Sequence, residues 1–223
     1  YFGKMLKSSE PLSTNKIFFG NLSEKIQPSM LDMFFDCVSK PDKSDVFLDQ
    51  LILDGHIVCT FFSGKEIGPR ALCNRSIICA ANNSKAVSDL NAKVKKREFF
   101  RPLAPVMLEE IAEKHFHIME NSKANCRWMA LTTKAKPNFP YEYMPALHKD
   151  KTARIQILED REHFIFKTLV RLKGRVDMLI NTSFNVAGDP IVHDLIDCYT
   201  NMQRLGVEYL ITESGLFQLK ASE

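Results

Sequence analysis

The chain has 223 residues, 45% hydrophobic and 26% charged, which is the composition of an ordinary globular protein with a full core. Its 30 basic and 27 acidic residues leave a net charge of only +3, so nucleic acid and anionic membrane are not expected partners. No apolar run approaches the roughly 20 residues that span a bilayer, and no signal-peptide pattern opens the chain. The cysteines include no CxxC pair, so neither a disulfide framework nor a cysteine zinc site is indicated, and we expect a cytoplasmic protein.

Helical patterns recur along the chain. In each, apolar residues are spaced to form one face, and a cap residue, glycine or turn stands at an end of the pattern. The predicted helices cover 28–38, 46–53, the segment that follows the cap Asn83-Ser84, 164–172 and 195–205. The helix after Asn83 has Val87, Leu90 and Val94 on its apolar face and delivers Lys95 and Arg97.

Strand patterns alternate with these helices. Runs of β-branched and aromatic residues bounded by turn residues predict strands over 56–62, 103–108 and 176–180, and a hairpin over 209–219. Pro105 lies inside the second of these runs and predicts an edge strand or an irregular path. The segment 132–151 shows no periodicity and is expected to be a long loop. The fold class is therefore α/β or α+β.

The densest positive segment is KVKKREFFRP. It contains Lys95, Arg97 and Arg101, and basic runs of this kind are commonly just a solvated helix face. The aromatic residues that follow Arg97 would anchor the backbone and fix the arginines, which a solvated face does not require. A fixed guanidinium group can donate two parallel hydrogen bonds to a phosphate, so the segment is a candidate anion site.

Two polar segments follow predicted strands. GPRALCNRS contains Arg70, Asn74 and Arg75, and NTSFNVAGDP contains Asn181, Ser183 and Asn185. Amide, hydroxyl and guanidinium groups at such positions suit phosphate or ribose, although arginines paired with surface acids and a turn that satisfies its own backbone remain alternative explanations. The sequence has no GxxxxGK[ST] phosphate loop and no GxSxG elbow. His115 and His117 lack a third ligand, so no metal site is predicted.

Four ordered blocks carry a family resemblance: FSGKEIGPRALCNRSI, LNAKVKKREFFRPLAPVMLEE, ALHKDKTARIQIL and MLINTSFNVAGDPIV. They resemble the carboxy-terminal part of the carbamoyltransferases that modify nodulation factors and antibiotics. The resemblance implies the fold of the threonylcarbamoyl-adenylate synthases, a twisted mixed sheet with flanking helices around a basic cavity. It also implies a division into a leader or linker over 1–27 and the carbamoyltransferase domain over 28–223.

The activity that the resemblance implies is conversion of carbamoyl phosphate and ATP to carbamoyl-adenylate, with release of phosphate and pyrophosphate. Two polyanions meet in this reaction, so several fixed cations are needed. Mg²⁺ would accompany ATP and bridge its phosphate oxygens. The resemblance assigns Lys95, Arg97 and Arg70 to catalysis, and the cofactor-binding residues would be Ser183, Asn185, Asn181, Arg154, Asn74, Arg75 and Arg101.

The sequence departs from the family pattern in two loops and in extent. Cys73 and Lys151 stand where the family usually has glycine, so the backbone path of those loops is expected to differ. The family's amino-terminal domain, which carries metal-binding histidines and transfers the carbamoyl group to an acceptor hydroxyl, is not in this sequence and is the expected partner. A homodimer is left open, and the acceptor is not identified.

Two other functions remain open. The same cavity could serve a module that binds a nucleotide or RNA end without catalysis. Alternatively, the chain could be a threonylcarbamoyl-adenylate synthase acting in tRNA modification, which would use threonine and bicarbonate. The GPRAL and TARIQ blocks favour the carbamoyltransferases over this last interpretation.

Overall fold

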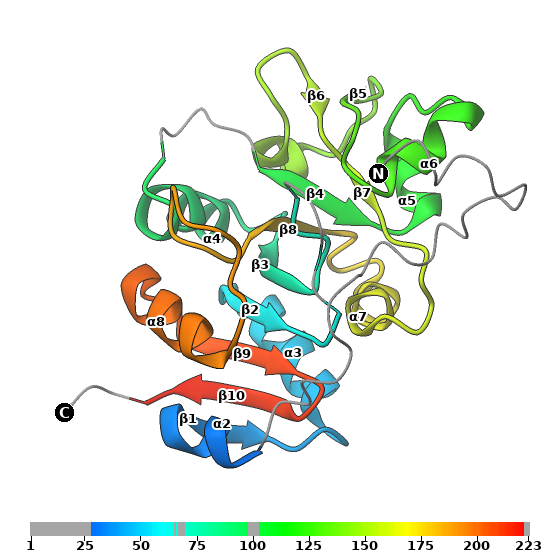
Figure 1. Ribbon diagram of the computed structural model, residues 1–223. Helices are drawn as coiled ribbons and strands as arrows, with labels where there is room; N and C mark the ends of the chain where they lie inside the picture. Colours follow the sequence, from blue (N-terminus) through cyan, green and yellow to red (C-terminus); the bar gives the residue numbers. More distant parts are fainter. Residues whose placement is uncertain (1–27, 65, 67–69, 98–102, 221–223) are drawn as a thin grey trace, which may run out of the picture.

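The computed structural model describes residues 28–64, 66, 70–97 and 103–220. At its centre is an eight-stranded mixed sheet in the order β1-β10-β9-β2-β3-β8-β4-β7 (Figure 1). Its strands are β1 (Phe35–Ser39), β2 (Val58–Phe61), β3 (Arg75–Ala80), β4 (Ala104–Met107), β7 (Gln156–Ile157), β8 (Met178–Ser183), β9 (Tyr209–Thr212) and β10 (Gly215–Leu219). Neighbouring strands are antiparallel except for the parallel pairs β2–β9 and β4–β7. The predicted mixed α/β class is confirmed.

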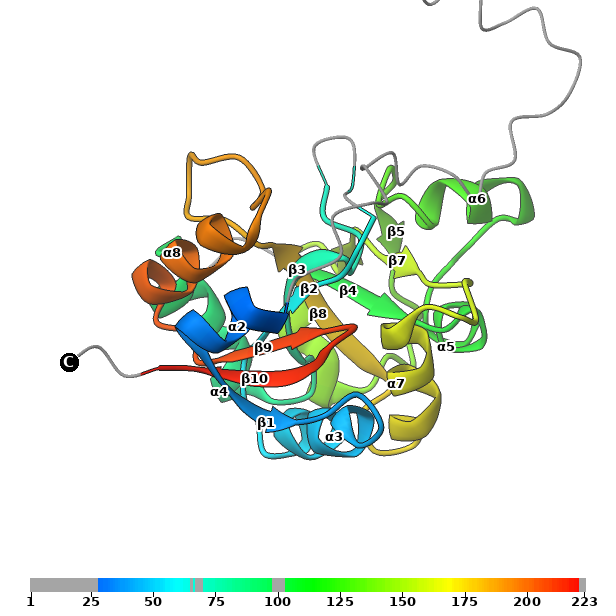
Figure 2. The ribbon, with the colours of Figure 1, turned by 60° about the horizontal axis from the view of Figure 1, so that its bottom comes forward.

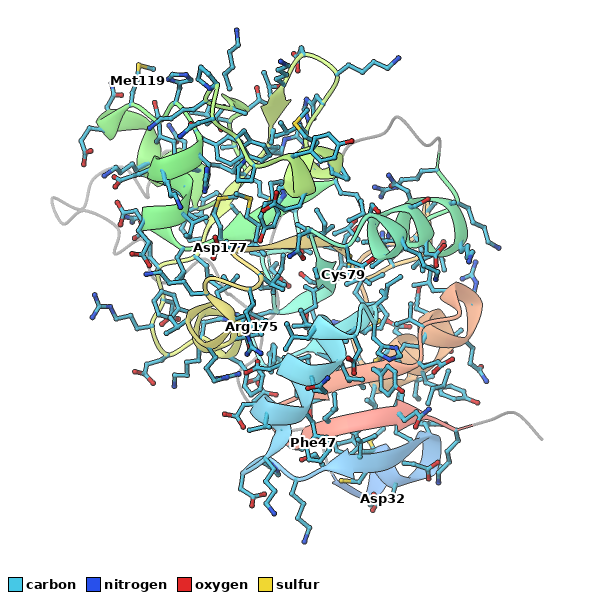
Figure 3. All side chains as sticks on the ribbon, turned by 180° about the vertical axis from the view of Figure 1, so that it is seen from behind. Asp32, Phe47, Cys79, Met119, Arg175 and Asp177 are labelled. Atoms are coloured by element: carbon cyan, nitrogen blue, oxygen red, sulfur yellow. The ribbon has the colours of Figure 1, made fainter. Side chains whose placement is uncertain are left out.

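Helices cover both faces of this sheet. They are α2 (Pro28–Phe34), α3 (Ser44–Leu53), α4 (Ser84–Asp89), α5 (Glu109–His115), α6 (Lys123–Cys126), α7 (Phe164–Leu172) and α8 (Leu195–Leu205). The pair α3 and α7 lies on one face, and the pair α2 and α8 lies on the other (Figures 1 and 2). Seen from behind, α3 with its exposed Phe47 lies in front of the part of the sheet that contains β10 (Figure 3). Within the described ranges, no helix is both long and apolar enough to cross a bilayer.

One continuous hydrophobic core joins the sheet to these helices. All six residues of β3 are buried, and β3 lies near the middle of the sheet between β2 and β8. This strand was missing from the sequence-based prediction, which had a loop as far as Ser76. The segment predicted as a long loop contains the small antiparallel pair β5 (Thr133–Lys134) and β6 (Thr152–Ala153) and a 3₁₀ helix over Tyr141–Ala146.

The helix predicted over 28–38 is correct only in its first half. It ends at Phe34, and the following residues form β1, which pairs with the last strand of the chain from Phe35 opposite Leu219. Phe34 stacks on Tyr199 of α8, with ring centroids 4.4 Å apart. The apolar spacing fits a helix and an edge strand equally well, and the pairing with β10 decides between them.

Of the two possibilities predicted for Pro105, an edge strand or an irregular path, the edge strand is wrong. Strand β4 lies inside the sheet, between β8 and β7. It pairs with β8 from Ala104 onward, whereas its pairing with β7 begins only at Val106. Pro105 has no N–H to donate, and its position before the β7 ladder makes that group unnecessary.

The other predicted elements are confirmed, α7, α8 and the terminal hairpin with the predicted ends and the rest with shifted ends. The side chain of Asn83 accepts a hydrogen bond from the Ala86 N–H at 3.0 Å and caps α4 as predicted. Helix α8 ends at Gly206, which adopts a left-handed φ of 65°. Strand β8 continues beyond Ile180 to Ser183, so part of the second polar segment belongs to the sheet.

Lys151 offers a test of backbone strain. Its φ is 62°, and its side chain is exposed, so glycine would relieve the left-handed strain at little loss of contacts. Lys151→Gly should therefore raise the free energy of unfolding by about 0.5 kcal/mol. Lys149→Gly is the matched control, because Lys149 is exposed and has an ordinary φ. This substitution should lower the free energy of unfolding. Urea denaturation of both variants measures the difference, and equal losses would contradict the expectation.

Candidate functional site

Three strands bring the predicted site segments to one edge of the sheet. Strand β8 ends at this edge, and its antiparallel neighbours β3 and β4 begin there. Ser76 pairs with Ser183, and Ala104 pairs with Asn181. Residues just before β3 and β4 and at the end of β8 therefore meet, although they are far apart in the sequence.

A cavity of about 110 Å³ lies at this edge. The predicted site residues that line it are Arg70, Arg97, Arg154, Asn181 and Ser183. Thr182 and Met129 also line it, and no acidic side chain is among its described lining residues. Pockets for whole drug-sized ligands are about 300–1,000 Å³. This cavity therefore suits a small anionic group, and a nucleotide held there would extend beyond it.

The arginines of the cavity influence one another. Arg70 lies at the exposed rim, and its pKa is lowered, first by partial loss of solvent and then by the positive charge of Arg154. Arg97 likewise lowers the pKa of Lys95. Like charges held this close favour an anion between them, because its binding relieves their repulsion.

Lys95 lies beside this cavity but points into the protein. Its side chain is 1% exposed, and its Nζ donates to the backbone oxygens of Ser183 at 2.9 Å and Asn185 at 2.6 Å and to Asn185 Oδ1 at 2.9 Å. Burial, and to a lesser degree Arg97, lower the pKa of Lys95 to about 8. The ammonium has three N–H donors, and these contacts engage all of them. The predicted contact of Lys95 with phosphate stays a prediction; the observed contacts hold the 183–185 loop.

A π-helical turn over Leu90–Val94 explains why Lys95 is buried within a basic run. The Lys95 N–H bonds to the Leu90 carbonyl at 2.9 Å, five residues back, instead of continuing an α-helix. Lys93 remains on the solvent side, where it pairs with Asp89, and Lys96 is also exposed. The helical pattern in the sequence could not show this change of pitch.

The 183–185 loop is tied internally. The Ser183 hydroxyl donates to Asn185 Oδ1 at 2.7 Å, and the Asn185 amide donates to the Asp189 carbonyl. Ser183 lines the cavity, whereas Asn185 is not among the residues that line it. Asn181 donates from Nδ2 to the Ala71 carbonyl at 3.0 Å, while its Oδ1 is buried without a hydrogen-bond partner among the described residues. A buried acceptor without a partner beside a cavity is available to a ligand donor.

Like Lys95 and Asn185, the predicted site residues Asn74 and Arg75 lie outside the described lining of the cavity. Asn74 donates to the Gly64 carbonyl at 2.6 Å and contacts the ring of His163. Arg75 is buried, and its guanidinium carbon lies 3.3 Å from the centroid of the Phe61 ring. Both side chains thus support the loop between β2 and β3. Arg101 lies outside the described residues.

Cys73 and Lys151 have left-handed backbones. The φ of Cys73 is 82° and that of Lys151 is 62°, which are values that glycine adopts without strain. The resemblance predicted glycine at these positions and a different backbone path for this chain. The conformation observed is the one glycine favours, so no change of path is needed to accommodate these side chains.

Glu66 is a buried residue of this region that the sequence analysis did not consider. Its side chain is 5% exposed, and one carboxylate oxygen accepts hydrogen bonds from the backbone of the 72–75 loop. A lone glutamate in a polar segment predicts solvent exposure, so the residue type gave no sign that this side chain is buried. Its position four residues before Arg70 was the only signal of a place near the site.

A second cavity of about 390 Å³ is lined in part by Leu72, Trp128, Gln156 and His163. The Nε2 of His163 is 2.8 Å from Asn74 Oδ1, and its Nδ1 accepts from the Ile165 N–H at 3.1 Å. Burial lowers the pKa of His163 to about 4. The neutral ring with the proton on Nε2 satisfies both contacts.

This arrangement predicts acid sensitivity. Unfolded His163 has an ordinary pKa near 6.5, so below that pH the unfolded chain binds a proton that the folded chain does not. The stabilisation is complete above pH 6.5 and should fall by about 2 kcal/mol by pH 5. Urea unfolding at pH 7.5 and pH 5 measures the fall. In His163→Gln, the fall in the free energy of unfolding between pH 7.5 and pH 5 should be smaller by about 2 kcal/mol. The same pH dependence as in the parent chain would refute the assignment of this fall to His163.

In the part of the chain that the structure describes, no group of three or more His, Cys, Asp or Glu side chains could hold a metal ion. His115 is buried, with its pKa lowered chiefly by burial, and neither ring nitrogen has a hydrogen-bond partner among the described residues.

Known proteins share the sequence pattern of most of this chain. Residues 49–218 match the family model described as "Carbamoyltransferase C-terminus". The nodulation protein NolNO of Sinorhizobium fredii is 30% identical over 174 residues, which cover 77% of this chain and 25% of that protein. The 3'-hydroxymethylcephem-O-carbamoyltransferase of Amycolatopsis lactamdurans is 27% identical over 184 residues, covering 81% of this chain and 34% of that protein. The chain thus spans about a quarter to a third of these relatives' lengths.

The fold is also similar to a solved structure. The crystal structure of P. abyssi Sua5 complexed with L-threonine matches with a TM-score of 0.53 and 16% sequence identity, over 79% of this chain and 48% of that one. At this identity the likeness concerns the fold alone. It confirms the predicted relation to that fold.

Proposed function

Because this chain belongs to the carbamoyltransferase C-terminal family, we propose that it activates carbamoyl phosphate with ATP to carbamoyl-adenylate, for transfer to an acceptor hydroxyl by a partner domain. The observation that carries the proposal is the convergence of Arg70, Arg97 and Arg154 on one cavity without acidic lining among its described residues. Reaction between two polyanions requires such a concentration of positive charge.

The reaction balances with one water molecule. Water cleaves carbamoyl phosphate to carbamate and inorganic phosphate, and a carbamate oxygen then attacks the α-phosphorus of ATP. The bond between that phosphorus and the bridging oxygen to the β-phosphate breaks, and pyrophosphate leaves. The arginines bring the anions together and stabilise the charge that develops on the phosphoryl oxygens. The protein supplies no covalent nucleophile in this scheme.

Asn181 and Ser183 give the cavity its polar specificity. The carbamoyl group carries an NH₂ donor, and Asn181 Oδ1 is a buried acceptor without a partner among the described residues. Ser183 lines the same cavity at the end of β8, which supports a contact between its hydroxyl and the adenylate phosphate. Mg²⁺ bound to the phosphates of ATP would supply positive charge that offsets the charge of the leaving pyrophosphate.

The test is pyrophosphate release from ATP in the presence of carbamoyl phosphate. We expect release that depends on both substrates, together with formation of carbamoyl-adenylate. ATP binding without pyrophosphate would instead indicate a binding module. The resemblance to the threonylcarbamoyl-adenylate synthases makes threonylcarbamoyl-adenylate synthesis the competing enzyme function, so the assay is repeated with threonine and bicarbonate in place of carbamoyl phosphate. Release only in that second mixture would reject the carbamoyltransferase proposal.

Transfer to an acceptor requires a second site, which we place outside these 223 residues. The relatives that match are three to four times as long as the matched part, so the rest of such a protein is the proposed source of the acceptor site. Supplying an amino-terminal domain of a relative in trans should convert pyrophosphate release into carbamoylation of that relative's acceptor.

A further inference from the structure

A single carboxylate oxygen organises the loop that precedes β3. Glu66 Oε1 accepts hydrogen bonds from the backbone N–H groups of Leu72 at 2.8 Å, Asn74 at 2.9 Å and Arg75 at 3.1 Å. The glutamate is buried, and its other oxygen, Oε2, has no hydrogen-bond partner among the described residues. Burial of a carboxylate is costly unless its contacts are strong, so these three hydrogen bonds must offset a substantial loss of solvation.

The loop has the form of an anion-binding nest. Cys73 adopts a left-handed φ of 82°, whereas the residues before and after it have negative φ values. This alternation turns neighbouring N–H groups toward one point. The Cys73 N–H is directed elsewhere, to the Ser76 hydroxyl at 2.9 Å. A nest of this kind would bind a free anion, but here the chain's own carboxylate occupies it.

The same loop forms one wall of the arginine cavity. Arg70 and Ala71 line the cavity, and the N–H of the next residue, Leu72, donates a hydrogen bond to Glu66 Oε1. The Ala71 carbonyl also accepts from Asn181 Nδ2, which ties the loop to β8. The anchored part of the loop therefore lies immediately beside the residues that would contact the substrate.

We infer that Glu66 is a positioning residue, whose carboxylate fills the 72–75 nest and thereby holds Arg70 and Ala71 in place before substrate arrives. The inference rests on the proposed function for the identity of the substrate. Glu66 is not among the described residues that line the cavity. Its role depends on the reach of its side chain more than on its charge, since the three N–H groups need an acceptor at one point.

Two substitutions separate reach from charge. Glu66→Gln keeps an acceptor oxygen at the same distance and removes the charge, whereas Glu66→Asp keeps the charge and is one methylene shorter. Glu213→Asp is the matched control, because Glu213 is another carboxylate in this region that binds a different backbone N–H, that of Ser63. The probes are hydrogen exchange at the amides of the 72–75 loop and calorimetric binding of inorganic pyrophosphate.

We expect Glu66→Asp to exchange at least about tenfold faster at Leu72, Asn74 and Arg75 and to bind pyrophosphate at least about tenfold more weakly. Glu66→Gln should stay within about threefold of the parent chain in both measurements. Faster exchange with unchanged pyrophosphate binding would reduce Glu66 to a structural role and overturn the inference. Equal losses in both variants would show that reach does not matter more than charge, and tighter binding in Glu66→Gln alone would show that charge is what matters. Either outcome would also overturn the inference.

The parent chain alone provides a further test, which applies even if the aspartate variant does not fold. Exchange at the three amides should already be slow before any ligand is added and should change little with pyrophosphate. Fast exchange that slows only on binding would mean that the loop is not held in advance. Absence of pyrophosphate release from ATP and carbamoyl phosphate would instead refute the proposed function and leave this exchange result standing.

Discussion

Lys95→Met should lower the free energy of unfolding by about 3 kcal/mol and reduce turnover at least about a hundredfold. Methionine has a similar length but no hydrogen-bond donor. The three oxygens that accept from Lys95, two backbone oxygens and Asn185 Oδ1, would therefore lose this donor. The 183–185 loop would then no longer be held against the end of β8. Urea denaturation measures the first effect, and pyrophosphate release from ATP and carbamoyl phosphate measures the second.

Lys93→Met is the matched control for this prediction. Lys93 lies two residues earlier, its side chain is 71% exposed, and its partner Asp89 also pairs with Lys85. Its replacement should change stability by at most about 0.5 kcal/mol and leave turnover intact. A Lys95→Met protein as stable and active as the control would show that the buried ammonium is not needed by the loop.

Arg154→Ala should lower kcat/KM for pyrophosphate release by about 10²–10³-fold while leaving thermal stability nearly unchanged. Arg154 lines the cavity just before β7, is partly exposed, and belongs to neither the core cluster nor a sheet ladder. The loss should arise from missing charge stabilisation and from poorer alignment of the anions. Arg154→Lys restores charge without the planar fork, so it should recover only part of the activity.

The control for Arg154 is Arg161→Ala. Arg161 is an exposed arginine on the larger, neighbouring cavity, and its loss should not affect turnover if the chemistry takes place among the arginines of the smaller one. Equal effects of the two substitutions would indicate a general contribution of positive charge. A larger effect of Arg161→Ala would move the proposed site to the other cavity.

The sequence predicted the position of a side chain best where that position follows from the neighbouring strand. Arg70, Arg154 and Ser183 lie near strand ends that meet at one edge of the sheet and line one cavity, and the family resemblance had assigned all three to the site. Asn74 and Arg75 come from the same kind of segment but support the loop. Nothing local distinguishes them from Arg70, because the difference depends on His163 and Phe61, which approach from other parts of the chain.

Errors in the predicted elements have a similar origin. The segment 35–39 became a strand because β10 pairs with it, and Pro105 is tolerated inside the sheet because the β7 ladder starts one residue later. The burial of Lys95 depends on a π-helical turn, for which the apolar spacing gives no signal. Each outcome is decided by a contact with a distant segment, which helical or strand periodicity does not encode.

The position of β8 in the sheet affects how the chain folds during its synthesis. Strands β3 and β4 are its two neighbours, yet both are synthesised well before it, and they do not pair with each other. A nascent chain that ends before residue 178 therefore exposes two unpaired strand edges, with Arg70 and Arg97 still apart. Because such long-range pairing is slow and exposed edges promote aggregation, we expect this interval of synthesis to be the stage at which the chain most needs a chaperone.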